Sequence, residues 1–116
     1  MSSPRLSALR STQRELGRKG VKAAVKRLYE SVGGKVYNTS GQRMFGNTPG
    51  LPDLIVFVPL KGRRIVLWHE AKAAKGKANE AQLMFRALAD EAHTVHVTGG
   101  LEEARIALVT LGVLAL

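Results

Sequence analysis

The chain has 116 residues, of which 45% are hydrophobic and 23% charged, and it contains no cysteine. This length fits one domain with a hydrophobic core, the composition excludes a disordered chain, and the lack of cysteine excludes disulfides and thiolate zinc sites. The most apolar stretch, residues 106–116, is too short to span a bilayer, which needs about 20 residues. We therefore expect a globular protein that has no membrane partner.

Positive charge is concentrated in the first part of the chain. Residues 1–49 hold ten Lys/Arg and two Asp/Glu, a net charge of +8, whereas residues 50–116 hold eight and seven, a net charge of +1. A localised basic region matches the phosphate backbone of a nucleic acid. A solvated basic helix face, or attraction to an acidic membrane, would give the same charge pattern. Nucleic acid is the partner that the charge favours.

The first elements follow from apolar spacing and turn residues. Residues 1–20 form a basic N-terminal segment that we expect to be helical, and helical spacing predicts a second helix over residues 21–32, ended by Gly33-Gly34. Alternation predicts a strand over residues 35–39. Residues 40–52 are rich in Gly and Pro and predict a long loop, a kind of segment that often carries function.

A hairpin, two helices and a further strand complete the expected fold. Strands over residues 53–58 and 64–72 join through a turn centred on Lys61-Gly62 into an antiparallel hairpin. Asn79 caps a helix that ends near residue 92, and a strand over 94–98 and a helix over 101–111 follow. The helix before the last strand permits a parallel pairing, so the sequence predicts an α/β fold with a mixed sheet.

The predicted hairpin brings together the side chains best suited to chemistry. Asp53 opens the first strand, and Glu70 and Lys72 share one face near the end of the second, because side chains alternate along a strand. Counting outward from the turn places Asp53 opposite residues near 70. Two adjacent carboxylates repel each other unless a cation lies between them, and hard oxygen ligands favour Mg²⁺ or Mn²⁺. The peptide carbonyl of Ala71 could add another oxygen ligand.

Such a site suits a phosphodiester substrate. Mg²⁺ keeps several waters and binds phosphate oxygens, and it can lower the pKa of a bound water. Lys72 could orient that water or stabilise the charge that develops on the phosphate. A plain cross-strand salt bridge from Lys72 to Asp53 or Glu70 is the alternative interpretation. By alternation His69 points to the opposite face, which indicates a structural role, and Trp68 is more typical of core packing than of base stacking.

The same residues resemble a known nuclease superfamily. Pro52-Asp53 followed by Glu70-Ala71-Lys72 looks like the PD-(D/E)xK pattern. The longer string, Gly50-Leu51-Pro52-Asp53-Leu54 with Glu70-Ala71-Lys72 and Gln82, is similar to the virus-type replication-repair nuclease (VRR-NUC) branch over about residues 21–99. The resemblance implies a restriction-endonuclease-like αβββαβ core within residues 21–116. It also implies that Asp53 and Glu70 ligate Mg²⁺ or Mn²⁺ and that Lys72 is the catalytic lysine.

Two further site residues come from the resemblance. It implies that Gln82 points into the site, although its place three residues after Asn79 also fits a capping box, and the two roles do not exclude each other. Relatives often carry an acid in the middle of the first helix, where this chain has Lys22 and Lys26. The acids near that helix are Glu15 and Glu30. We assign the catalytic role to Glu15, since Glu30 could pair with Lys26.

These observations predict a stand-alone, homodimeric endonuclease that hydrolyses DNA with Mg²⁺ or Mn²⁺. The resemblance implies branched substrates such as a Holliday junction or a flap, a role in DNA repair, and a cytoplasmic location in a prokaryote or as a phage product. The apolar tail from Leu108 to Leu116 is either a dimer interface or part of the core. The rival hypothesis is a non-catalytic nucleic-acid-binding module on the same fold. The expected nucleic-acid contacts are basic: Lys22, Lys26, Arg43, Lys75 and Lys77.

Overall fold

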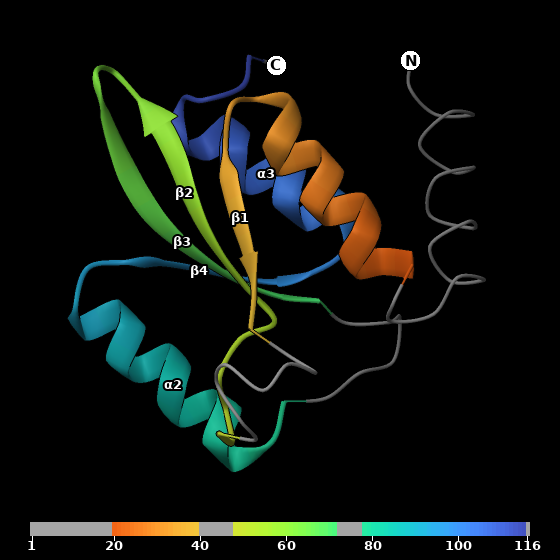
Figure 1. The fold of residues 1–116 in the computed structure, drawn as a ribbon. Coiled ribbons are helices and arrows are strands. Elements are labelled where there is room, and N and C mark those ends of the chain that lie inside the picture. The colour runs from red at the N-terminus through yellow and green to blue at the C-terminus, as the bar shows by residue number, and fades with distance from the viewer. Residues whose placement is uncertain (1–19, 40–47, 72–77, 116) are drawn as a thin grey trace.

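A computed structural model describes residues 20–39, 48–71 and 78–115 of the chain. Its elements follow in the order β1 (Lys35–Asn38), β2 (Leu54–Leu60), β3 (Arg63–Ala71), α2 (Glu80–Glu91), β4 (Val95–Gly99) and α3 (Leu101–Leu111). A further helix, orange in Figure 1, covers residues 20–31 ahead of β1. The predicted order is confirmed for the described ranges. Gly20, which we assigned to a separate N-terminal segment, already belongs to this helix, and residues 1–19 lie outside the described ranges.

The four strands form one mixed sheet in the order β1-β2-β3-β4. The two pairings that involve β2 are antiparallel, and β3 pairs with β4 in parallel. The predicted turn between β2 and β3 is confirmed at Lys61 and Gly62, which both have positive φ angles, of 52° and 83°. Two such residues are typical of a type I′ hairpin turn, whose twist matches that of the flanking strands. This turn fixes the register of the hairpin.

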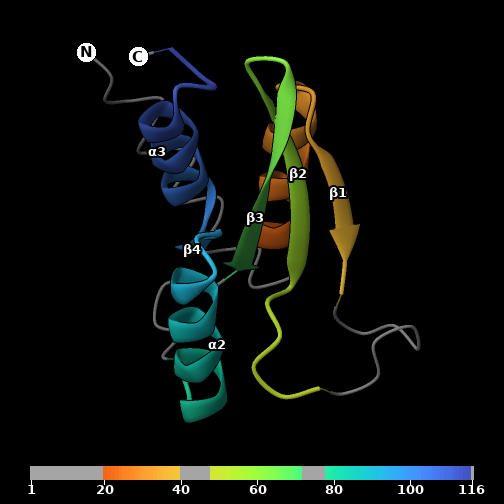
Figure 2. The same cartoon turned by 90° about the vertical axis from the view of Figure 1, so that its left-hand side faces the viewer.

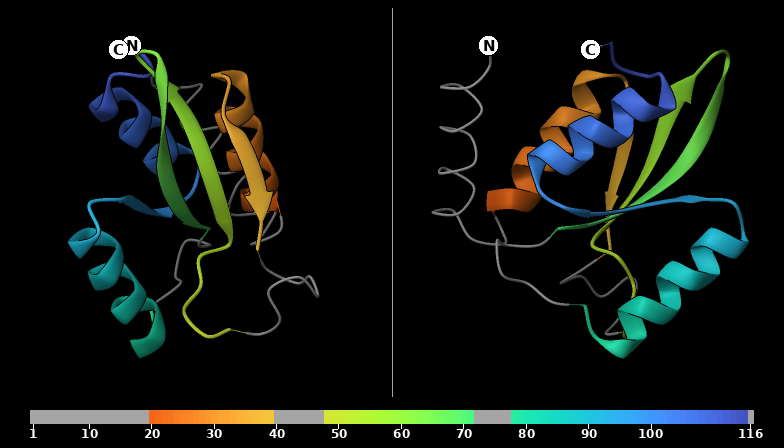
Figure 3. Two further views of the ribbon diagram at one scale, coloured as in Figure 1. Left: turned by 60° about the vertical axis from the view of Figure 1, so that its left-hand side comes forward. Right: turned by 180° about the vertical axis from the view of Figure 1, so that it is seen from behind.

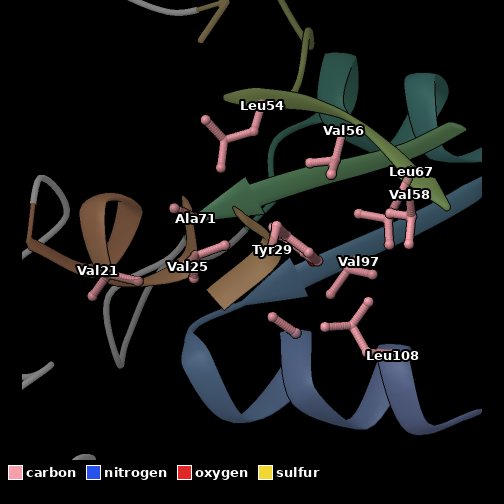
Figure 4. Packing of buried hydrophobic residues seen from close by; sticks show 11 residues of the cluster. Val21, Val25, Tyr29, Leu54, Val56, Val58, Leu67, Ala71, Val97 and Leu108 are labelled. Atoms are coloured by element: carbon pink, nitrogen blue, oxygen red, sulfur yellow. The ribbon is translucent and has the colours of Figure 1, made fainter. Parts of the chain in front are cut away.

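The hydrophobic core lies between one face of the sheet, the helix over residues 20–31 and α3 (Figure 3). Alternate residues of β2 point into it, because side chains alternate along a strand. Figure 4 shows how the buried side chains of the two helices meet those of the strands. The core consists of Val21, Val25, Tyr29, Leu54, Val56, Val58, Leu67, Ala71, Val97, Ala104 and Leu108.

Several residues of the apolar tail pack into this core. Leu108 is fully buried, and Leu111, Val113 and Leu114 are partly buried and pack against the core cluster. Gly112 ends α3 in the left-handed conformation, with a φ angle of 86°, and turns the chain back toward the sheet. Of the two interpretations that the sequence left open, the structure therefore supports core packing for these residues.

Helix α2 covers part of the other face of the sheet (Figure 1). The Phe85 ring meets Trp68 edge-on, with 4.8 Å between ring centroids, and Trp68 Nε1 donates a hydrogen bond to Thr94 Oγ1 at 3.2 Å. Trp68 thus packs beneath α2, as we expected. Among the described helices, none has the length and apolar character that crossing a bilayer requires.

Candidate active site

Asp53 and Glu70 lie opposite each other at one end of the hairpin. Leu54 pairs with His69 in the register of β2 and β3, so the residues next to them, Asp53 and Glu70, face each other across the two strands. The backbone N–H of Ala71 donates a hydrogen bond to Asp53 Oδ2 at 2.9 Å, which holds the Asp53 carboxylate against the end of β3. The juxtaposition that counting from the turn predicted is therefore confirmed.

Both carboxylates are buried, with 1% of each residue exposed. Burying two acidic groups side by side costs free energy, and a bound cation offsets this cost. Within the described ranges no group of three or more His, Cys, Asp or Glu residues is arranged so that it could hold a metal ion. A pair of carboxylates is nevertheless the usual protein contribution to Mg²⁺, which completes its octahedron with waters and phosphate oxygens. The donor set fits a hard divalent cation.

The backbone around Asp53 is held by Thr39, a buried residue that follows β1. The Thr39 N–H donates to the carbonyl oxygen of Asp53 at 2.8 Å, and the Thr39 hydroxyl donates to the carbonyl oxygen of Pro52. These two bonds fix the carbonyl groups on both sides of the Asp53 Cα. Sequence reasoning missed Thr39, because a single threonine at a strand end gives no distinctive signal.

Gly50 joins the segment before Asp53 to the first turn of α2. Its φ angle is +86°, and a Cβ atom added to it would lie 2.3 Å from the carbonyl oxygen of Ala81. Only glycine permits both this conformation and this approach. In Figure 2 the yellow segment ahead of β2 extends down beside α2. The contact places the start of α2, and with it Gln82, next to the segment that carries Asp53.

Gln82 closes a capping box at the start of α2. Its backbone N–H donates to Asn79 Oδ1 at 2.9 Å, and its side-chain Oε1 accepts a hydrogen bond from the Asn79 N–H at 2.9 Å. The capping role predicted from the sequence is therefore confirmed. The role of Gln82 in catalysis stays a prediction.

His69 lies behind Glu70, on the core face of β3. Its Nε2 is 3.0 Å from the carbonyl oxygen of Gly99, which can only accept, so Nε2 carries the proton. Its Nδ1 then accepts a hydrogen bond from the Tyr29 hydroxyl at 2.5 Å. Burial lowers the pKa of His69 to about 4, although the Gly99 hydrogen bond and the charges of Asp53 and Glu103 act in the opposite direction. His69 is thus neutral, and its buried hydrogen bonds agree with the structural role that the sequence indicates.

Several predicted site residues lie outside the described ranges, so their roles stay predictions. They are Glu15, Arg43, Lys72, Lys75 and Lys77. Lys22 and Lys26 are on the helix over residues 20–31, where Lys26 is exposed and Lys22 Nζ donates to Asn38 Oδ1 at 3.3 Å.

Glu30 lies near the far end of the sheet from Asp53. It is exposed in the last turn of the helix over residues 20–31, shortly before Gly33. A Cβ added to Gly33 would meet the side chain of Pro59 at 3.2 Å, and Pro59 is close to the hairpin turn. Asp53 precedes the opposite end of β2. This separation argues against Glu30 as the supporting acid.

The fold resembles that of a known domain. A solved structure described as a VRR_NUC domain matches with a TM-score of 0.59 and 22% sequence identity, over 80% of this chain and 94% of that chain. The fold is that of a VRR_NUC domain. The restriction-endonuclease-like α/β fold predicted from the sequence is therefore confirmed. No protein-family model matches the sequence, and a comparison with curated proteins finds no match.

Proposed function

We propose that this chain is an endonuclease that hydrolyses DNA phosphodiester bonds with Mg²⁺ or Mn²⁺ held by Asp53 and Glu70. The observation that carries the proposal is the pair of carboxylates, each 1% exposed, that face each other where β2 begins and β3 ends. Burial of two carboxylates at this position costs folding free energy. We therefore expect the two acids to have a functional role. The VRR_NUC fold supports this interpretation.

The chain's own residues would orient the reacting groups. The Ala71 N–H holds one oxygen of Asp53, which fixes that carboxylate against the end of β3. The Ala71 carbonyl would add a third oxygen ligand. When bound, a divalent cation supplies a water of lowered pKa and offsets negative charge on the phosphate. Lys72, two residues after Glu70, would hold the attacking water or stabilise the phosphate in the transition state. Gln82 and Glu15 would support the site.

The excess of basic residues supports DNA as the substrate. The formal net charge of +9 favours a polyanion, and neutralised phosphates release counterions that drive binding. Lys22, Lys26, Arg43, Lys75 and Lys77 would bind phosphates. We propose a homodimer acting on branched DNA, such as a Holliday junction or a flap, because one domain of this size covers little DNA alone.

Cleavage of a DNA panel tests this function. The wild-type protein should cut at least one of a junction, a flap, a duplex or a single strand in Mn²⁺ or Mg²⁺, and EDTA should abolish cleavage. Asp53→Asn and Lys72→Ala should each lower the rate about a hundredfold or more, because the first removes a charged ligand of the cation and the second removes positive charge that stabilises the transition state. Glu91→Gln, which removes an exposed acid at the end of α2, is the matched control and should keep the wild-type rate.

Two results would change the conclusion. A wild-type protein that binds these DNAs but cuts none of them in either metal would establish the non-catalytic binding module instead. If Asp53→Asn cleaves as fast as the wild type, the activity lies elsewhere in the chain and the site is wrong.

A further inference from the structure

Thr98 lies beside Glu70 in the sheet. The parallel register of β3 and β4 pairs Glu70 with Thr98 and Ala71 with Gly99. Paired residues of neighbouring strands project from the same face, and the strands are about 4.8 Å apart. Because Asp53 lies opposite Glu70 on the other side of β3, the three residues form one row across the sheet. Thr98 therefore continues the line of the two carboxylates onto a third strand.

The Thr98 hydroxyl is buried, and it has no hydrogen-bond partner within the described part of the chain. Thr94, one residue before β4, shows the contrast. Its hydroxyl accepts from Trp68 Nε1 at 3.2 Å and donates to the carbonyl oxygen of Ala89 at 3.0 Å. Buried hydroxyls nearly always have a protein or water partner, so each exception calls for an explanation. The missing hydrogen bond of the Thr98 hydroxyl is explained if that bond forms only when a cation occupies the neighbouring candidate site.

We propose that Thr98 is a positioning residue of the cation site, whose hydroxyl donates a hydrogen bond to the Glu70 carboxylate when Glu70 holds the divalent cation. This inference rests on the proposed function. A carboxylate that ligates through one oxygen leaves its second oxygen to accept from a neighbouring donor, and that donor fixes the orientation of the ligand.

The two side chains are suited to this contact. Threonine is branched at Cβ, so its hydroxyl is confined to few rotamers and costs little entropy to hold. Glutamate is long enough to turn toward the next strand. The backbone at Glu70 is held firmly because β3 pairs on both of its sides, with β2 and with β4.

Metal binding by two substitutions of Thr98 tests the proposal without a cleavage assay. Thr98→Val replaces the hydroxyl with a methyl group of similar size, and Thr98→Ser keeps the hydroxyl. In calorimetric titrations with Mn²⁺, Thr98→Val should bind about tenfold or more weakly than the wild type, as is typical for the loss of an outer-shell partner. Thr98→Ser should bind with nearly the wild-type affinity. Thr110→Val, at an exposed position on α3, is the matched control and should not change the affinity.

The metal-free melting temperature separates positioning from packing. Thr98→Val removes a buried hydroxyl that lacks a partner, so its metal-free melting temperature should equal or exceed that of the wild type. A lower melting temperature would assign Thr98 to packing and overturn the inference.

Three binding outcomes are decisive as well. Equal Mn²⁺ affinity for the wild type and Thr98→Val overturns the inference, while DNA cleavage by the wild type would leave the proposed function intact. If Thr98→Ser binds as weakly as Thr98→Val, the hydroxyl is not responsible, and the inference fails. A wild-type protein that neither binds Mn²⁺ nor cleaves DNA refutes the proposed function, and this inference with it.

Discussion

Acidification should destabilise this protein through His69, which is fully buried and neutral. Burial lowers the pKa of its imidazole from 6.5 to about 4, with the Gly99 hydrogen bond and two nearby carboxylates limiting the change. In the unfolded chain His69 takes up a proton below about pH 6.5, whereas in the folded chain it does so only below about pH 4. Between these values the unfolded state binds more protons, so the free energy of unfolding falls as the pH falls.

The size of the effect follows from the difference between the two pKa values. Lowering the pKa from 6.5 to about 4 corresponds to about 3 kcal/mol, at roughly 1.4 kcal/mol per pH unit. This stability is fully present above about pH 6.5 and is lost as the pH approaches 4. A loss of that size is a large part of the 5 to 15 kcal/mol that is typical, as a rough range, of small domains. His69 should therefore contribute strongly to acid sensitivity.

Urea unfolding of the wild type and of His69→Gln measures this contribution. Trp68 is the single tryptophan of the chain, and its packing against Phe85 makes its fluorescence a probe of folding. All other residues are the same in the two proteins, so the difference between the two pH dependences isolates His69. Between neutral pH and about pH 4 the wild type should lose about 3 kcal/mol more than His69→Gln. An NMR titration of the His69 ring should give a pKa near 4.

Equal losses in the two proteins, or a His69 pKa near 6.5, would refute this reasoning. Either result would mean that the imidazole is solvated or charged in the folded state. The hydrogen bonds from Tyr29 and to Gly99 would then not be those of a neutral ring.

Three further substitutions test individual contacts, and a fourth, Gly62→Ala, is the control for the first. Gly50→Ala should destabilise the protein by about 2 kcal/mol or more and slow cleavage, since it adds a clash with Ala81 to backbone strain. Gly62→Ala, with a similar φ angle of +83° and no atom within 4 Å of the added Cβ, should cost only about 1 kcal/mol, and equal urea midpoints for the two variants would disprove the contact. Tyr29→Phe should cost about 1 to 3 kcal/mol and raise the pKa of His69, because it removes the donor to Nδ1; an unchanged NMR titration would contradict the hydrogen bond. Asn79→Ala should lower the free energy of unfolding by about 1 kcal/mol through loss of the helix cap, and an unchanged thermal melt would show that the cap contributes nothing.

Local rules were sufficient to predict that Asp53 and Glu70 lie opposite each other in the candidate site. The turn at Lys61-Gly62 sets the hairpin register, so counting along both strands places Asp53 opposite Glu70. The capping box of Asn79 and Gln82 is equally local, since both residues lie within one helical turn. These features depend on neighbours in the sequence or on a two-residue turn, and such geometry is fixed by the chain itself.

Features that depend on distant parts of the chain could not be predicted. Tyr29 and His69 are 40 residues apart and meet only after the helix packs on the sheet. Gly50 belongs to the string that carries the family resemblance, but nothing in the sequence indicates its contact with Ala81, which joins a loop to a helix. The pairing of Thr98 with Glu70 could not be predicted because the connection from β3 to β4 passes through α2. No turn rule fixes the register of such a crossover.

The hairpin turn is a suitable position for a fluorescent label. Lys61 and Gly62 are exposed, and nothing lies within 4 Å of a Cβ placed on Gly62. The turn is at the opposite end of β2 and β3 from Asp53 and Glu70, separated from them by the length of both strands. Exposed loop tips of this kind tolerate insertions and attached groups. Since the chain has no cysteine, Lys61→Cys would create a unique thiol for a fluorescent dye. A dye at that position would report on DNA binding or self-association while leaving the carboxylates untouched.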